Sequence, residues 1–115
     1  MRSQDNLQQT WLSLESALIE RLQIKPGMDT ILLFIGKREA GLPAKEFTDN
    51  EKLNLRQMAV CTILVPAGYY QLLWVDDFGW PNFKQLQREP VMSGFERETF
   101  LKPWVILYAE KNKLV

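Results

Sequence analysis

Histidine is absent from the 115-residue chain, and cysteine occurs once, at Cys61. Without histidine, a Ser-His-Asp or Cys-His catalytic arrangement cannot form within one chain, and structural zinc lacks its usual ligands. One cysteine allows no internal disulfide, whereas small secreted domains usually carry several. We therefore expect a cytoplasmic protein with no metal and no cofactor, in which Cys61 behaves as a small hydrophobic group.

An excess of either charge is also lacking, because 14 Lys and Arg balance 14 Asp and Glu. Proteins that bind nucleic acid normally carry a basic excess or stripe, since phosphate neutralisation supplies much of their affinity. The composition thus predicts no nucleic-acid partner. A net charge near zero also removes self-repulsion, which permits self-association.

Glycine motifs and long apolar runs are missing as well. The six glycines are not spaced as in a dinucleotide fingerprint or a phosphate-binding loop. The longest apolar stretches, residues 31–35 and 59–65, are too short to span a bilayer. The first nine residues lack the apolar centre of a signal peptide. These absences predict no membrane association and no nucleotide chemistry.

What is present fits one globular domain over residues 1–115, with 46% hydrophobic and 24% charged residues. Apolar residues at helical spacing predict a first helix over residues 5–24, stopped by Lys25-Pro26-Gly27. The capping sequence from Thr48 to Glu51 predicts a third helix that reaches about residue 65.

Residues 29–40 are interpreted as the second helix, with Asp29 as its N-cap and Gly41 as its C-cap. The apolar run at 31–35 is also compatible with a buried strand, because periodicity cannot separate the two in so short a segment. Gly36 in this segment would allow another element to approach closely. A second capping sequence, at residues 93–96, opens the last helix, which Pro103 should kink or divide.

Between the third and last helices, residues 69–86 favour a β-hairpin. Asp77-Phe78-Gly79 is typical of a three-residue hairpin loop, with Gly79 in the left-handed position. The pairing that this loop implies puts four large side chains on one face, packed against the helices: Tyr70, Leu72, Trp74 and Leu86. The expected fold is mainly α (α+β), a helical domain with one β-hairpin in the order α-α-α-β-β-α.

The expected core is formed by apolar residues of the first, third and last helices, namely Leu14, Leu18, Val60, Leu64, Leu101 and Val105. The runs Met58-Ala59-Val60-Cys61, Gly68-Tyr69-Tyr70 and Gly79-Trp80-Pro81 together resemble a group of small bacterial proteins of unknown function. The resemblance covers about the second half of the chain. It implies the helix–hairpin–helix order and no particular activity.

The candidate partner-binding residues lie at the hairpin loop. Phe78 at the loop tip and Trp80 beside it are aromatic residues next to an edge strand, a combination typical of contact sites. Asp76 and Asp77 flank them and would suit a partner with a basic rim. Two alternatives remain open: the loop folds back and buries Phe78, or the aspartates serve only to form the turn.

The leading hypothesis is a non-enzymatic protein-interaction module that binds a protein partner or a second copy of itself as a homodimer. The alternative is a small carboxylate-based enzyme or ligand-binding domain, in which Asp76 and Asp77 hold Mg²⁺ or act as acid and base. No catalytic residue is predicted. A deep pocket with converging carboxylates would favour the alternative, and an apolar surface patch would favour the interaction module.

Overall fold

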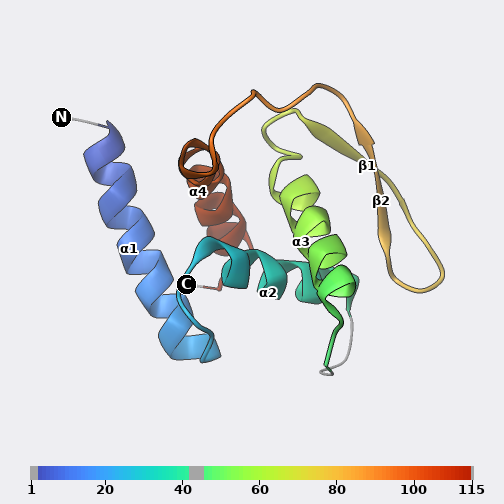
Figure 1. The fold of residues 1–115 in the computed structure, drawn as a ribbon, viewed down its shortest axis with the longest axis horizontal. Helices are drawn as coiled ribbons and strands as arrows, with labels where there is room; N and C mark the ends of the chain where they lie inside the picture. Colours follow the sequence, from blue (N-terminus) through green and yellow to red (C-terminus); the bar gives the residue numbers. More distant parts are fainter. Residues whose placement is uncertain (1–2, 42–45, 115) are drawn as a thin grey trace.

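The computed structural model describes residues 3–41 and 46–114, which form four helices and one antiparallel hairpin (Figure 1). The order is α1 (Ser3–Leu22), α2 (Met28–Ala40), α3 (Asp49–Ile63), β1 (Tyr70–Val75), β2 (Pro81–Gln85) and α4 (Gly94–Lys111). This is the predicted α-α-α-β-β-α arrangement. The region 31–35 lies within α2, so the helical interpretation of this segment is confirmed.

The helix boundaries follow local backbone chemistry. Gln23 adopts a left-handed conformation, with φ of 54°, and α1 therefore ends at Leu22, two residues before the predicted end. The prediction of Asp29 as the N-cap of α2 is wrong. Gly27, with φ of 120°, turns the chain one residue before Met28, and its N–H donates to Glu15 Oε2 at 2.9 Å.

Both predicted capping boxes are present, and they begin α3 and α4. Thr48 accepts from the Glu51 N–H while the Glu51 carboxylate accepts from the Thr48 N–H, and Ser93 and Glu96 repeat the pattern. Pro103 does not divide α4, which is one helix to Lys111. This proline lies on the exposed side of the helix, where water can bind the carbonyl that it leaves without a donor.

The main core lies between the helices, and all six residues predicted for it are buried. Gly36 on α2 is the position of closest approach: a Cβ there would lie 2.2 Å from the Leu55 carbonyl oxygen of α3. A smaller cluster of Ala40, Leu55 and Met58 joins the same two helices. Gly41, left-handed at φ 63°, ends α2 as predicted.

The hairpin contains a β-bulge that the sequence did not predict. Leu72 pairs with Phe83 and Trp74 pairs with Asn82, so that Leu73 has no partner across the sheet. A one-residue insertion moves all later side chains to the other face. The predicted common face of Tyr70, Leu72, Trp74 and Leu86 is therefore wrong, because Leu86 now bonds to Tyr69 instead of lying opposite Tyr70.

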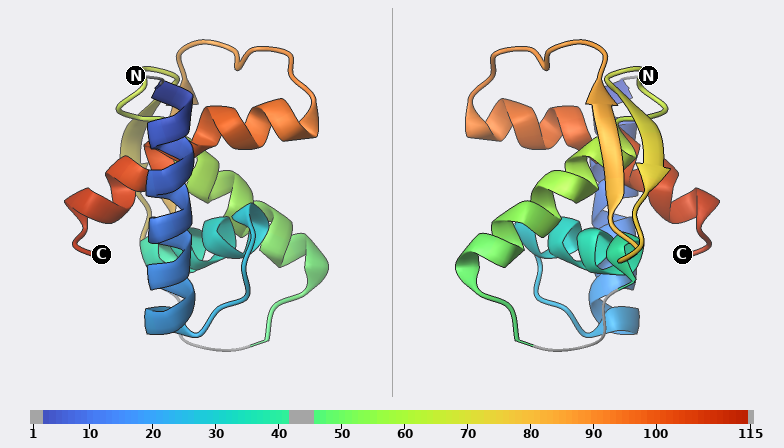
Figure 2. Two further views of the ribbon diagram at one scale, coloured as in Figure 1. Left: turned by 90° about the vertical axis from the view of Figure 1, so that its left-hand side faces the viewer. Right: turned by 90° about the vertical axis from the view of Figure 1, so that its right-hand side faces the viewer.

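The hairpin rests on the helices at its two ends. At its base, the Tyr70 hydroxyl donates to Glu89 at 3.3 Å, and Glu89 accepts from Arg97 Nε of α4 at 3.2 Å. Near its tip, Trp80 and Phe83 pack against the Ala40–Leu55–Met58 cluster. The hairpin lies along one side of the helices (Figure 2).

Candidate functional site

The hairpin turn is organised by the Asp76 carboxylate. Its Oδ1 accepts from the N–H groups of Phe78 and Trp80, both at 2.9 Å. The Gly79 N–H donates to the Asp76 carbonyl at 3.0 Å, and Gly79 has the predicted left-handed conformation, with φ of 85°. Asp76 therefore acts as the turn-forming residue, one of the alternatives that the sequence left open.

The structure separates the four predicted contact residues into two groups. Phe78 is 89% exposed and Asp77 is exposed beside it, so the loop does not fold back over Phe78. Trp80 is half-buried and packs toward α2 and α3 instead of outward. Phe78 and Asp77 thus belong to an open surface, while Trp80 holds the loop in place.

Partly exposed apolar side chains also occur along β1. Leu72, Leu73, Trp74 and Val75 follow one another, and each is about half exposed, between 47% and 57%. The expectation that Trp74 packs on the helices is wrong, because the bulge at Leu73 changes which side chains face inward. Sequence reasoning missed this surface because a β-bulge has no reliable signature in one sequence.

A cavity of about 300 Å³ lies beneath the hairpin. Its walls are mostly apolar and come from β1, β2, the end of α3 and the second half of α4: Ile63, Val65, Pro66, Leu72, Val75, Pro81, Phe83, Trp104 and Leu107. Such a volume lies at the lower end of the range for small-ligand sites.

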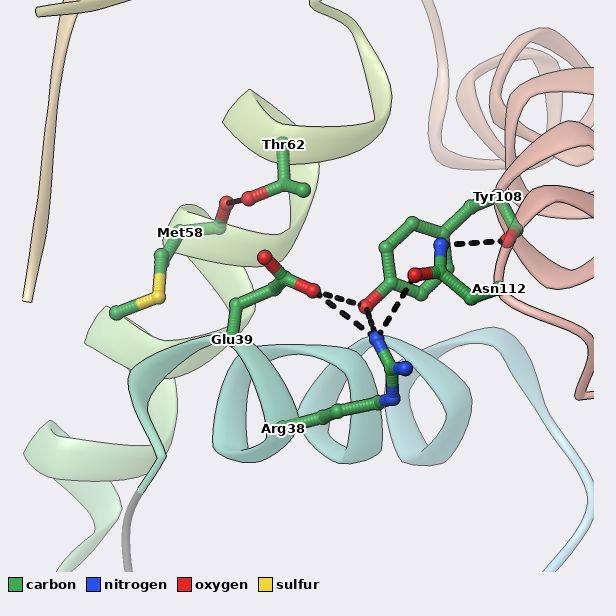
Figure 3. Close-up of polar contacts among 6 residues, drawn as sticks. All are labelled: Arg38, Glu39, Met58, Thr62, Tyr108 and Asn112. Atoms are coloured by element: carbon green, nitrogen blue, oxygen red, sulfur yellow. Dashed lines mark hydrogen bonds and ion pairs between the residues drawn. The ribbon is translucent and has the colours of Figure 1, made fainter. Parts of the chain in front are cut away.

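A polar network closes one side of the cavity, where α2 meets α4 (Figure 3). The Tyr108 hydroxyl donates to the Glu39 carboxylate and accepts from Arg38 at 2.8 Å. Arg38 also forms an ion pair with Glu39 at 3.2 Å and donates to Asn112 at 3.1 Å. Burial, and then the bond to Glu39, raises the pKa of Tyr108, so its hydroxyl stays neutral and serves as a donor.

Two groups with catalytic chemistry, Glu39 and Cys61, are held by their surroundings in forms that serve the structure. Among the described residues that line the cavity, Glu39 is the single carboxylate, and Arg38 neutralises it. Burial, together with the nearby Glu89 charge, raises the pKa of Cys61, which keeps it a thiol and not a thiolate nucleophile. Within residues 3–41 and 46–114, no three Cys, Asp or Glu side chains are grouped to hold a metal ion.

None of the helices within residues 3–41 and 46–114 is long and apolar enough to cross a bilayer. Comparison with known proteins returned no matching family model, no matching curated protein and no matching solved structure. The hairpin and the cavity beneath it are therefore the features from which a function can be inferred.

Proposed function

We propose that this chain is a non-enzymatic protein-interaction module whose contact surface is the hairpin. The observation that carries the proposal is a set of exposed apolar side chains at the hairpin, with Phe78 at the tip and Leu73 and Trp74 on β1, while Leu72 and Val75 line the cavity. Soluble proteins seldom expose large apolar side chains in groups, and such groups mark contact sites more often than chance. Asp77, exposed beside Phe78, adds a charge suited to a basic rim on the partner.

Phe78 is the side chain best placed to act as an anchor in a partner's pocket. It is almost fully exposed, so removing it from water on binding contributes the whole hydrophobic value of an aromatic ring. The turn that carries it is held by three hydrogen bonds to Asp76, so little conformational freedom is lost on binding. A fixed aromatic anchor of this kind is typical of interface hot spots.

Site-specific photo-cross-linking tests this proposal, with Phe95 as a matched control. Phe95 is also an exposed phenylalanine, at 79%, but lies on the first turn of α4, away from the hairpin. A photoreactive phenylalanine at position 78 should give discrete adducts in native cells, and the same group at position 95 should not. Identical adduct patterns at the two positions would contradict the proposal.

Two substitutions separate binding from stability. Phe78→Ser and Phe95→Ser should each leave the melting temperature within about a degree or two, because exposed side chains contribute little to the core. To read out binding, a photoreactive residue replaces Leu73 in each variant. Phe78→Ser should abolish the adducts formed at position 73, and Phe95→Ser should not. If Phe78→Ser unfolds the protein, Phe78 is part of the core and the proposed surface is wrong.

A second candidate, a small-ligand-binding domain, is favoured by the apolar cavity with Glu39 in its wall. An apolar molecule with one N–H or O–H donor suits a cavity of this composition. Titration with indole should then shift the methyl resonances of Leu72 and Leu107 in a saturable way. Shifts that stay linear to millimolar indole, or that spread over the whole surface, would remove this candidate.

A further inference from the structure

The two outer edges of the hairpin differ in their protection against further strand pairing. β2 begins with Pro81, which has no N–H to donate, and carries the exposed charge of Lys84. Proline and lysine are residues that natural proteins place on edge strands to prevent pairing. β1 has the sequence Tyr-Gln-Leu-Leu-Trp-Val, without proline, glycine or charge. The β1 edge therefore lacks proline and charge, and the β-bulge at Leu73 interrupts regular pairing along it.

On either side of the bulge, the backbone of β1 presents hydrogen-bonding groups along its outer edge. The Asp76 N–H donates to the Trp80 carbonyl at 3.0 Å, and the Leu86 N–H donates to the Tyr69 carbonyl at 2.8 Å. Residue pairs in an antiparallel ladder alternate between hydrogen-bonded and non-hydrogen-bonded. Tyr70 follows Tyr69 and Val75 precedes Asp76, so Tyr70 and Val75 direct their backbone N–H and C=O groups away from β2. Pro81, opposite Val75, presents no N–H on its own outer edge.

The β1 strand remains exposed although it contacts α3. The side chains of residues 71–75 are exposed. A strand added to β1 would meet apolar side chains as well as backbone groups, which are the two components of binding by strand addition.

We propose that the strand added to β1 is β1 of a second copy of this chain, paired antiparallel across a two-fold axis. The result is a four-stranded sheet in the order β2-β1-β1-β2. Both of its outer edges are then β2, with Pro81 and Lys84, so the assembly closes at a dimer and does not grow into a fibre. This inference rests on the proposed function, because it names the partner of the same surface.

Charge complementarity supports a second copy over an unrelated strand. The hairpin is acidic at its tip, with Asp76 and Asp77, and basic toward its open end, with Lys84 and Arg88. Antiparallel pairing brings the acidic tip of one copy toward the basic end of the other, which is favourable twice in a symmetric dimer. β1 itself carries no charge, so no like charges are brought together along the seam.

The test is the mass of the purified full chain, measured by sedimentation equilibrium from about 1 to 500 μM. Wild type should change from monomer to dimer in this range. Leu73→Lys adds a charge to the β1 edge and should weaken the dimer by at least about tenfold. Gln85→Lys, its matched control on the protected β2 strand, should leave the dimer intact. A monomer at every concentration, or equal weakening by both variants, overturns the proposal.

Hydrogen exchange on wild type gives a readout that does not depend on a variant folding. The amides of Tyr70 and Val75 should exchange more slowly at high protein concentration than at low concentration. The Asp76 amide, already bonded to Trp80, should be unaffected. If the exchange of Tyr70 and Val75 is independent of concentration in a dimeric sample, the copies meet through another surface. If the chain is a monomer but position 78 still cross-links to a different protein, the proposed dimer is wrong and the proposed function stands.

Discussion

Substitution of Gly36 by alanine reverses the usual effect of alanine in a helix. In an exposed helix interior, Gly→Ala stabilises a protein by about 1 kcal/mol, because alanine has the higher helix propensity. Gly36 is buried where α2 crosses α3, and an added Cβ would meet the Leu55 carbonyl oxygen at 2.2 Å and its carbonyl carbon at 2.7 Å. Both atoms belong to the backbone, so no side-chain rotation relieves the overlap.

The cost follows from the distance that the two helices must separate. Ordinary contact begins at 3.4 Å, so α2 and α3 must move apart by about 1 Å at this point, and a gap of that size forfeits a quarter to a half of the dispersion energy of the contacts around it. Overpacking of this kind typically costs about 1–3 kcal/mol. We expect Gly36→Ala to lie at the upper end, because backbone meets backbone.

Urea unfolding followed by far-UV circular dichroism measures this change. A loss of about 2–3 kcal/mol lowers the midpoint by roughly 1–2 M urea at the slope of a chain this size. Gly94→Ala is the control, since Gly94 is also helical but a Cβ there meets nothing within 4 Å. It should be neutral or slightly stabilising. A Gly36→Ala protein as stable as wild type would refute the close approach of α2 to α3.

Three further expectations test the core, a helix cap and the polar network. Leu64→Ala should cost about 2–5 kcal/mol in urea unfolding, because Leu64 is fully buried; a loss below about 1 kcal/mol would remove it from the core. The backbone and side chain of Ser93 lower the pKa of Glu96. The stability that these bonds contribute is therefore present at neutral pH and disappears as the pH falls through the pKa of Glu96 in the folded protein. Ser93→Ala should raise the pKa of Glu96 only in part in an NMR titration, because the bond from the Ser93 backbone N–H remains, and an unchanged value would exclude a contribution from the Ser93 side chain. The raised pKa of Tyr108 stabilises the fold below pH 10, and this contribution is lost as the pH rises further. The melting temperature of Tyr108→Phe should therefore fall less steeply than that of wild type between pH 9 and 11, and parallel curves would argue against the network.

The helices could be predicted because their signals are local. The capping box at Thr48 and the apolar spacing of α1 depend on residues within one or two turns, and both are present in the structure. The helix ends differ by one or two residues where a single backbone conformation decides them, as the left-handed Gln23 does. Gly36 as a point of close approach was also predictable, since an isolated glycine inside a helix usually has a packing reason.

The candidate site was predictable only in part. The exposed tip followed from the turn chemistry around Asp76 and Gly79, which is local. The apolar surface of β1 did not, because it depends on a bulge at Leu73 that shifts the register by one residue. The cavity and the contact of Glu39 with Tyr108 join segments 69 residues apart, and no pattern along the chain indicates such a meeting.

The packing of α1 against α4 has a consequence for biosynthesis. These helices are the first and last elements of the chain, and the apolar side of α1, with Trp11, Leu14 and Leu18, is buried in a core that α4 helps to complete (Figure 1). At roughly 5–20 residues per second, the ribosome needs on the order of ten seconds to add the residues between the end of α1 and the end of α4. Throughout that interval the apolar stripe of α1 lacks its final cover. The nascent chain thus exposes apolar surface that the folded protein buries.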